Sequence, residues 1–599
     1  MPYTDFHEEE ITEKPFDARL MVRLLGYLKP YIGWVALAFA LILLTSIISQ
    51  AGPYLTKIAV DTYILKGNFQ GLNRIVLLFV GLLLLQFLTS YGERFITQLT
   101  GQWAMYDVRA EIFAHLQRLP LAFFDRTPIG RLMTRNTNDV DALNELFTDG
   151  IVASFSDLFT VIAIIVYMFY LDTDLALVTC AAVPVMFGVT FWFQSRMLRA
   201  FRLARTRLAR LNAFLQENIT GMDVVQLFNR ERRHTEQFDA VNSRYVEANL
   251  LSALYNSFFY PIMELIGAVV MALAIWYGSG EVVRSRIDWG ILIAMLQYIP
   301  RFFWPILDIA ERYAILQTAM ASSERIFELL DTKPEPEGGN VAPQRATGEI
   351  EFRNVWFAYK GEEWVLRDVS FHITPGESVA LVGATGSGKT TTISLLARFY
   401  DIQKGAILVD GIDIREWNVE GLRRRIGIVQ QDVFLFSGNI EENIRLGNQG
   451  ISQERVEQAA QDVNADRFIQ RLPDGYQHTL TERGSTLSSG QRQLLAFARA
   501  LAFDPDILVL DEATASVDTE TELWIQDAVE RLMQTRTSII IAHRLSTIRN
   551  ADTIIVMHKG EVREIGRHEE LLAKDGIYRR LHQLQYSDRE KETTVPTVR

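Results

Sequence analysis

Six apolar stretches, each close to the length of a membrane-spanning helix, lie before about residue 312, and none follows it. We place them near 31–52, 72–95, 150–171, 173–195, 254–278 and 287–310. A helix needs about 20 residues to cross a hydrocarbon core of about 30 Å. Runs such as Val35–Leu44 and Ile75–Leu85 are too long and too free of charge for buried helices of a soluble protein. Residues 31–330 are therefore predicted to form an all-α polytopic membrane domain with six transmembrane helices.

The composition excludes several other classes of protein. The 599 residues are 49% hydrophobic and 22% charged, which excludes a disordered or collagen-like chain. The formal net charge of -12 argues against nucleic acid as the main partner. Because the single cysteine, Cys180, lies in an apolar run, neither an internal disulfide nor a cysteine-rich metal site is expected.

The distribution of arginine predicts the orientation in the membrane. The segments 97–149 and 196–253 are rich in arginine, whereas the connection at 171–174 contains two aspartates. The positive-inside rule puts both long segments and both termini in the cytoplasm. The two segments have the pattern of helical extensions of the spans, joined by short turns. Residues 1–30 are expected to form a tail and an amphipathic elbow helix in the membrane interface, with a plain linker as the alternative.

Ionisable and aromatic residues at membrane depth are candidates for a substrate cavity. Charged side chains are costly there, and aromatic rings suit amphipathic compounds. The candidates are Glu264, Tyr298, Arg301, Trp304 and Asp308. Charged side chains that extend to the interface and aromatic ones that only pack between helices are the alternatives.

The second half of the chain follows a polar linker rich in proline and glycine, residues 331–348. Over 349–585 short β-rich runs alternate with helical segments, as in an α/β domain, and 586–599 has the composition of a disordered tail. The run Ser378–Val382 has the pattern of a buried strand, and the residues after it fit the P-loop motif G-x-x-x-x-G-K-[ST] before a helical segment. The predicted nucleotide-binding residues of this loop and helix are Gly383, Ala384, Thr385, Gly386, Ser387, Gly388, Lys389, Thr390 and Thr391.

This motif predicts the chemistry of phosphate binding and hydrolysis. Backbone N–H groups and the N-terminus of the following helix face the phosphates. Lys389 is expected to reach the outer phosphates, and the hydroxyl of Thr390 to ligate Mg²⁺. A second apolar strand ends in Asp511 and Glu512. Asp511 suits the Mg²⁺ side of the site, and Glu512 is placed to orient or deprotonate the attacking water.

The segment Leu487–Gln491 resembles the signature sequence of the ATP-binding-cassette (ABC) family, and the resemblance covers nearly the whole chain. It implies that Tyr359 stacks on the adenine of ATP and that Gln431 joins Thr390 and Asp511 around Mg²⁺, partly through water. It also implies that His543 contacts the γ-phosphate beside the catalytic Glu512. Asp518 matches the aspartate of the inter-subunit loop.

The membrane half resembles the six-span ABC exporters independently. Phe123–Asp139 and Phe214–Glu231 are similar to their two intracellular turns, and Glu482–Gly484 to the loop that faces those turns. The resemblance implies that each turn sits as a short coupling helix on an ATP-binding domain. The resemblance implies a half-transporter that needs a second half. Each of two ATP molecules is then held between the P-loop of one chain and the signature of the other. The residues that would contact the partner's ATP are Ser488, Ser489, Gly490 and Gln491.

One departure from the family pattern concerns the partner. The family's usual signature has glycine where this chain has Ser489, and the added side chain is expected to loosen the fit to the partner's γ-phosphate. This chain's own P-loop, Asp511 and Glu512 match the pattern. The combination resembles the subunit of bacterial heterodimeric multidrug exporters that keeps the catalytic glutamate. A homodimer that tolerates the small serine is the alternative.

The resemblance implies ATP-driven export of amphipathic small molecules by alternating access across the cytoplasmic (inner) membrane of a bacterium. A homodimeric flippase for lipids or lipid-linked substrates, a peptide exporter and an importer with the exporter fold are the alternatives. A soluble ABC ATPase that acts on chromosomes or ribosomes is disfavoured, because such proteins lack membrane spans.

Overall fold

The computed structural model describes residues 17–343, 345–511, 519–533, 536–541 and 548–583. The chain divides into two compact units. The first comprises Met1–Gln117 and Pro128–Thr332, and the second comprises Arg118–Thr127 and Lys333–Arg599. The short segment Arg118–Thr127 therefore belongs to the same unit as the C-terminal half, although it lies within the predicted membrane domain in sequence.

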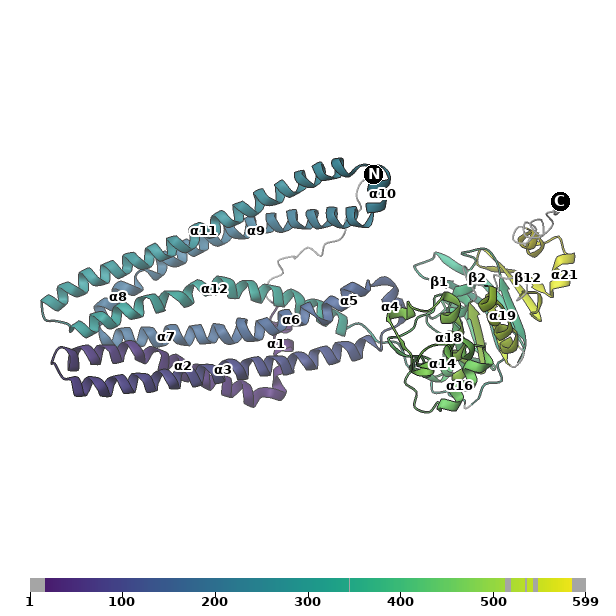
Figure 1. Cartoon of the computed structure of the whole chain (residues 1–599), viewed down its shortest axis with the longest axis horizontal. Coiled ribbons are helices and arrows are strands. Elements are labelled where there is room, and N and C mark those ends of the chain that lie inside the picture. The colour runs from purple at the N-terminus through teal and green to yellow at the C-terminus, as the bar shows by residue number, and fades with distance from the viewer. Residues whose placement is uncertain (1–16, 344, 512–518, 534–535, 542–547, 584–599) are drawn as a thin grey trace. The chain divides into compact units, whose positions relative to one another are not determined.

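Long helices form the first unit (Figure 1). Within the described residues, five helical runs are long and apolar enough to cross a membrane, and the sixth predicted stretch falls on α12, a helix of 42 residues. The predicted helical membrane domain is thereby confirmed, with helices that extend beyond the apolar stretches. The five runs are Ala18–Ile64, Phe69–Leu116, Ile129–Leu171, Thr173–Thr220 and Glu231–Val283. The elements are α1 (Ala18–Leu25), η1 (Gly26–Tyr31), α2 (Ile32–Ile58), η2 (Ala59–Ile64), α3 (Phe69–Leu116), α5 (Ile129–Asn136), α6 (Asn138–Glu145), η3 (Leu146–Val152), α7 (Ala153–Leu171), α8 (Thr173–Cys180), α9 (Val183–Thr220), α10 (Met222–Leu227), α11 (Glu231–Val283) and α12 (Trp289–Leu330).

Side-chain caps mark two of the short turns between these helices. Asn68 precedes α3 and its side chain accepts a hydrogen bond from Gly71 N at 2.9 Å. Asp172 precedes α8 and accepts from Leu175 N at 2.9 Å. Such caps satisfy backbone donors that the first turn of a helix leaves unpaired. The turns are therefore encoded locally, between apolar runs that encode the helices.

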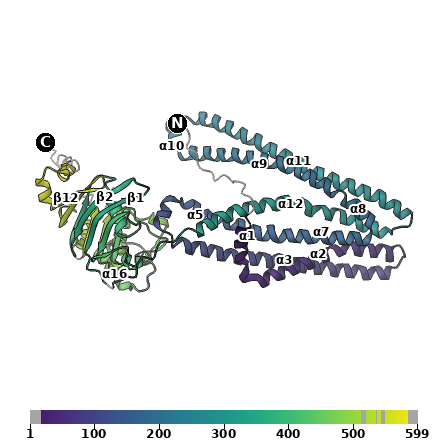
Figure 2. The same ribbon diagram turned by 180° about the vertical axis from the view of Figure 1, so that it is seen from behind.

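The helices pack in pairs and around one core. From both sides α9 and α11 lie side by side with α10 at their shared end, and α2 lies along α3 (Figure 2). The main buried cluster of this unit is formed by α7, α8, α9, α11 and α12, and includes Met186, Phe259, Tyr298 and Phe302. Many large apolar side chains elsewhere are exposed, among them Leu84 and Phe87 of α3. An apolar exterior of this kind suits contact with lipid.

The second unit contains the short helix α4 (Leu121–Arg126) and an α/β domain with two main sheets. The antiparallel sheet has the order β2-β1-β4-β5, and the larger sheet has the order β12-β11-β3-β10-β9-β6. All neighbours in the larger sheet are parallel except β12 with β11. The predicted α/β ATPase fold is thereby confirmed. The strands are β1 (Ile350–Ala358), β2 (Trp364–Ile373), β3 (Ser378–Val382), β4 (Lys404–Val409), β5 (Ile412–Asp413), β6 (Ile426–Val429), β7 (Gly438–Asn439), β8 (Thr479–Leu480), β9 (Ile507–Asp511), β10 (Thr537–Ile541), β11 (Thr553–His558) and β12 (Glu561–Gly566).

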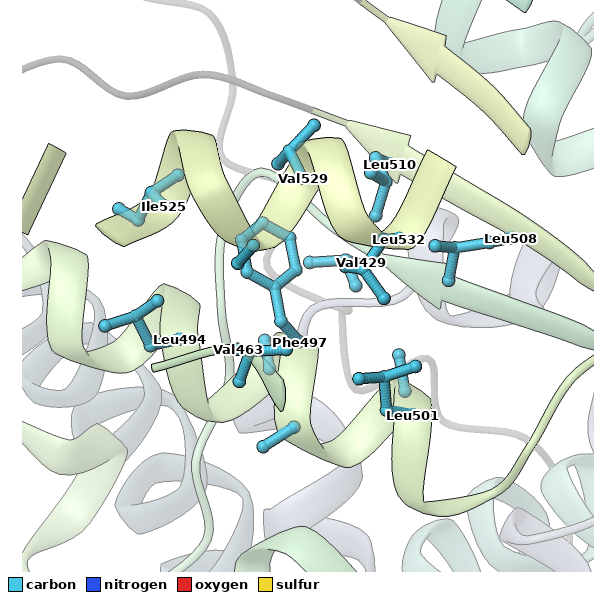
Figure 3. Close-up of a cluster of buried hydrophobic side chains, with 14 of the residues drawn as sticks. Val429, Val463, Leu494, Phe497, Leu501, Leu508, Leu510, Ile525, Val529 and Leu532 are labelled. Carbon is cyan, nitrogen blue, oxygen red and sulfur yellow. The ribbon is translucent and has the colours of Figure 1, made fainter. Parts of the chain in front are cut away.

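Alternate residues of the parallel strands face two different cores. Leu508 and Leu510 of β9 lie in a cluster with the helices α18 (Ser489–Ala502) and α19 (Thr519–Met533), whereas Val509 faces the cluster that includes the antiparallel sheet. In Figure 3 the ring of Phe497 on α18 points toward α19. Burial on both faces explains why these strands are continuous apolar runs. The other helices of this unit are α13 (Lys389–Leu396), α14 (Val419–Arg425), α15 (Ile440–Arg445), α16 (Gln453–Asp462), α17 (Asp466–Ile469), η4 (Gly475–Gln477), η5 (Glu482–Gly484) and α21 (His568–Ala573).

Candidate nucleotide-binding site

The carboxyl ends of the parallel strands bring several predicted site residues to one edge of the larger sheet. Ile541 of β10 pairs with Leu381 of β3 on one side and with Asp511 of β9 on the other. On the far side of β9, Val429 of β6 pairs with Leu510, and the exposed Gln431 follows two residues later. Ligands of open α/β sheets bind outside the carboxyl ends of the strands. The P-loop, Asp511 and Gln431 therefore share the edge at which such a ligand binds.

The P-loop has the backbone geometry that its glycines permit. Gly386 and Gly388 have φ values of 80° and 102°, in the left-handed region that favours glycine. A Cβ on Gly388 would lie 2.4 Å from Leu366 Cδ2, so a side chain there would require the buried Leu366 side chain to move. Residues 384–386 are exposed, and α13 begins directly after Gly388. The loop thus presents backbone N–H groups at a helix N-terminus, an arrangement that binds phosphate.

Lys389 lies at the centre of this loop. Its ammonium group donates hydrogen bonds to the carbonyl oxygens of Gly383, at 2.7 Å, and of Ala384, at 3.1 Å. Burial lowers the pKa of this lysine, and the nearby Asp511 carboxylate opposes that effect. A cation buried against a phosphate-binding loop is suited to pair with an anionic ligand.

The loop also has an unsatisfied polar group. The hydroxyl of Ser387 is buried and has no hydrogen-bond partner among the described residues. A buried hydroxyl without a partner is costly, and a ligand oxygen would satisfy it. The residues expected around Mg²⁺ are a hydroxyl, an amide and a carboxylate on the same strand edge, with Thr390 and Gln431 exposed and Asp511 half-buried. Oxygen donors of this kind fit Mg²⁺, which retains several waters as further ligands.

Tyr359 follows β1 and lies beside the first turn of α13. Its hydroxyl is 3.1 Å from the hydroxyl of Thr391, and Phe357 and Tyr400 meet it with ring centroids 4.8 and 5.1 Å away, both edge to face. The side chain nevertheless remains 39% exposed. Its aromatic surface is therefore partly open to a planar base.

Glu512, Asp518 and His543 lie outside the described residues. The catalytic roles of Glu512 and His543 and the inter-subunit role of Asp518 remain predictions. β9 ends at Asp511, directly before Glu512, and β10 ends at Ile541, two residues before His543.

The signature residues form the start of α18. Ser488 is the N-cap: its hydroxyl accepts from Gln491 N at 3.2 Å, and its own N–H donates to the Gln491 side chain at 3.0 Å. This reciprocal pair is a capping box. Ser489 and Gly490 are the first two residues of the helix, and Ser489 is exposed. The departure from glycine therefore lies on the surface of the protomer, at a helix N-terminus.

The five candidate cavity residues of the membrane unit have different surroundings. Tyr298 is fully buried and donates to the Gln50 carbonyl at 2.5 Å, while Arg301 donates to the Ser49 carbonyl at 2.8 Å. The structure thus brings these two residues of α12 to the same part of α2. Glu264 and Trp304 are exposed and Asp308 is half-buried. Their role in a substrate cavity remains a prediction.

Sequence reasoning missed several residues around Tyr359. Tyr400, Gln403, Asp125 and Arg126 contact it or its neighbours. Asp125 and Arg126 lie in Phe123–Asp139, which the sequence marks only as an intracellular turn. The one sequence feature that could have indicated these contacts is Tyr400 itself, an aromatic residue shortly after the P-loop helix. Nothing in its spacing indicates which residue it meets.

Comparison with known proteins establishes the family. Residues 35–306 match the family described as the ABC transporter transmembrane region, and residues 366–515 match the family described as ABC transporter. Bacillus subtilis (strain 168) has a protein named uncharacterized ABC transporter ATP-binding protein YknV that is 41% identical over 590 residues, 97% of each chain. The probable multidrug resistance ABC transporter ATP-binding/permease protein YheH of the same organism is 39% identical over 526 residues, 86% of this chain and 77% of its own. The ATP-dependent lipid A-core flippase of Syntrophus aciditrophicus (strain SB) is 36% identical over 568 residues, 94% of each chain.

This chain belongs to the ABC transporter family. It has the half-transporter architecture of the exporter type, with a multi-pass membrane domain fused to a domain that binds and hydrolyses ATP. Exporters of this type work as dimers and act on membrane-associated substrates. The predicted family, fold class and ATPase activity are thereby confirmed.

Proposed function

We propose that this chain is one half of a heterodimeric exporter that moves amphipathic small molecules out across the inner membrane of a bacterium. Its termini and ATPase domain are cytoplasmic in this proposal, as the arginine-rich segments favour. The convergence of the P-loop, Asp511 and Gln431 at one strand edge carries the ATP-driven part of the proposal. The relative YheH, a probable multidrug resistance transporter, supports multidrug export, and the lipid A-core flippase is the precedent for a lipid substrate.

The ATP site uses groups that the fold has already oriented. Tyr359 stacks on adenine, the P-loop N–H groups bind the phosphates, and Lys389 neutralises the outer ones. Thr390, Gln431 and Asp511 would hold Mg²⁺, partly through water, and the bound ion would neutralise charge on the phosphates.

Two groups act on the reaction itself. Glu512 orients and deprotonates the attacking water, and His543 contacts the γ-phosphate. Proton transfer to a positioned carboxylate contributes typically about 10²- to 10⁴-fold in rate.

The two ATP sites of the dimer are unequal in this proposal. The competent site combines this chain's P-loop and Glu512 with the partner's signature. The impaired site receives Ser488, Ser489, Gly490 and Gln491 of this chain. Support comes from the position of Ser489, which is exposed and lies in the first turn of α18, the helix N-terminus that would face the partner's ATP.

Transport follows from differential ATP affinity. ATP that binds the closed ATPase pair more tightly than the open pair shifts the whole dimer toward the closed state, and hydrolysis releases it. In the membrane domain, the aromatic Tyr298 and Trp304 and the charged Glu264, Arg301 and Asp308 are the proposed contacts of an amphipathic cargo.

Inverted membrane vesicles test the export of amphipathic compounds. We expect ATP to drive accumulation of the fluorescent dye rhodamine 6G inside vesicles that contain the wild-type chain with its partner. The Glu512→Gln variant should still bind ATP but accumulate no dye, with turnover lowered about 10²- to 10⁴-fold. Arg424→Ala, which changes an exposed arginine of α14 paired with Glu420, is the matched control and should behave as wild type.

Three outcomes would contradict the proposal. Equal accumulation by Glu512→Gln would remove the catalytic role of this glutamate. ATP-driven loss of dye from inverted vesicles would indicate uptake in place of export. ATP-driven movement of a fluorescent phospholipid without movement of the dye would favour the lipid flippase.

A further inference from the structure

The short helix α4 contacts the ATPase residues within their compact unit. It begins after Pro120, whose φ is -66°. Proline has no backbone N–H, and none is required at the start of a helix. Asp125 and Arg126 occupy its last two positions, and both are exposed. In the chain, α4 lies between α3 and α5, which belong to the membrane unit.

Arg126 holds the backbone of Tyr359. Its Nη2 donates a hydrogen bond to the Tyr359 carbonyl oxygen at 3.0 Å. The preceding residue, Ala358, is held separately by the Gln403 side chain, which accepts from its N–H at 3.1 Å and donates to its carbonyl at 2.8 Å. Hydrogen bonds thus fix the backbone on both sides of the Ala358–Tyr359 peptide bond.

Asp125 holds the ring that packs on Tyr359. The Tyr400 hydroxyl donates a hydrogen bond to the Asp125 carboxylate. Burial and this contact raise the pKa of Tyr400, so the hydroxyl is a weaker acid than that of an ordinary tyrosine and remains the donor. The Tyr400 ring meets the Tyr359 ring at an interplanar angle of 90°, with centroids 5.1 Å apart. Edge-to-face packing of this kind restricts the tilt of both rings.

The other end of the α4 segment is also held. Glu335 N donates to the Arg118 carbonyl at 2.7 Å, and the Glu335 carboxylate accepts two hydrogen bonds from Arg423 at 2.9 and 2.7 Å. A cavity of about 240 Å³ lies beside these contacts, lined by Pro120, Ala122 and Arg126 and by the two tyrosines among other residues. The contacts between α4 and the residues around Tyr359 that can be named are therefore polar ones.

We propose that Arg126 and the Asp125–Tyr400 pair are positioning residues that hold Tyr359 in the orientation that stacks on adenine, so that ATP affinity depends on α4. This inference rests on the proposed adenine-stacking role of Tyr359. In this proposal Arg126, Asp125 and Tyr400 do not touch the nucleotide themselves and act only through Tyr359. By thermodynamic reciprocity, bound adenine stabilises the contact of α4 with Tyr359 to the same extent.

A comparison of ATP binding with inorganic tripolyphosphate binding distinguishes a role in positioning Tyr359 from a general loss of structure in the ATPase domain. Both dissociation constants are measured for the full-length chain in lipid nanodiscs, in a Glu512→Gln background in which turnover is expected to be slow. Tripolyphosphate has the phosphates but no base, so its binding also reports an intact P-loop. We expect Tyr359→Ala to weaken ATP binding about 5- to 150-fold, the loss typical of a base stacked on an aromatic ring, and to leave tripolyphosphate unchanged.

Arg126→Ala and Tyr400→Phe should each weaken ATP binding by about twofold or more and leave tripolyphosphate unchanged. In the Tyr359→Ala background neither should add a further loss, because the stack that they support is already gone. Arg424→Ala is the control and should change neither ligand. Unchanged ATP affinity in both variants, or a parallel loss for ATP and tripolyphosphate, would overturn the inference. Unchanged ATP affinity in Tyr359→Ala would instead overturn the proposed role of Tyr359 itself.

Discussion

At the residue scale, Lys389 keeps a positive charge in a place where burial disfavours it. Its lowered pKa means that the free protein loses this proton at a lower pH than an unfolded lysine, which titrates near about 10.4. The protonated form attracts phosphate, so we expect ATP affinity to fall as pH rises, beginning below that value. Folding stability should change in the opposite direction, because deprotonation removes the cost of a buried charge.

A titration of ATP affinity from about pH 8 to about pH 10 checks this expectation, since the phosphates of ATP are already ionised over that range. Lys389→Arg is the comparison, because a guanidinium stays charged throughout. ATP affinity should fall with pH in the wild type and stay level in this variant. The same slope in both would assign the pH dependence to another group.

The residues of the P-loop were predictable, whereas those that surround Tyr359 were not. Lys389 and Asp511 lie in motifs whose spacing follows from a strand, a turn and a helix. Tyr400 and Asp125 are 275 residues apart, and their hydrogen bond depends on the fold of the whole unit. Sequence motifs reflect local backbone geometry. Contacts between residues so far apart in the chain have no characteristic spacing by which they could be predicted.

At the element scale, the capping box of α18 both starts the helix and forms the predicted signature. Ser488→Ala removes a hydroxyl that accepts from Gln491 N and should cost about 1 kcal/mol in the free energy of unfolding. We expect a fall in Tm of about 2–4 °C. ATP turnover of the assembled dimer should fall as well, since this helix N-terminus is proposed to face the partner's ATP.

Ser452→Ala is the matched control, because Ser452 caps α16 in the same way and accepts from Arg455 N at 3.3 Å. Thermal unfolding should show a similar loss in both variants. Turnover at a temperature well below either Tm should be lower in Ser488→Ala alone. Equal losses of turnover would mean that stability, and not the signature, explains the effect.

The apolar stretches predicted that long helices form, but they predicted the lengths of these helices only in part. The apolar stretch at 254–278 is part of α11, which continues for 53 residues from Glu231 to Val283. Polar residues end an apolar window, yet arginine, glutamate, alanine and leucine all favour helix, so the backbone continues. Helix α4 has six residues, too few for a periodic pattern, so only the family resemblance predicted a short helix in this turn.

At the scale of the whole molecule, the chain supplies one P-loop, at 383–390, and one signature, at 487–491. A dimer of the family type needs two of each, so the identity of the second half decides whether the two ATP sites are equal. In the sequence, only Ser489 indicates that the two ATP sites are unequal. The effect of one exposed side chain on a partner depends on that partner, which is why the assembly was less predictable than the fold.

The oligomeric mass and ATP turnover of this chain, purified alone in lipid nanodiscs, test the heterodimer most directly. We expect a monomeric or weakly active chain whose turnover is restored by a co-expressed neighbouring half-transporter. A stable dimer of this chain alone, with brisk and cooperative hydrolysis, would contradict it and would show that Ser489 is harmless in a homodimer.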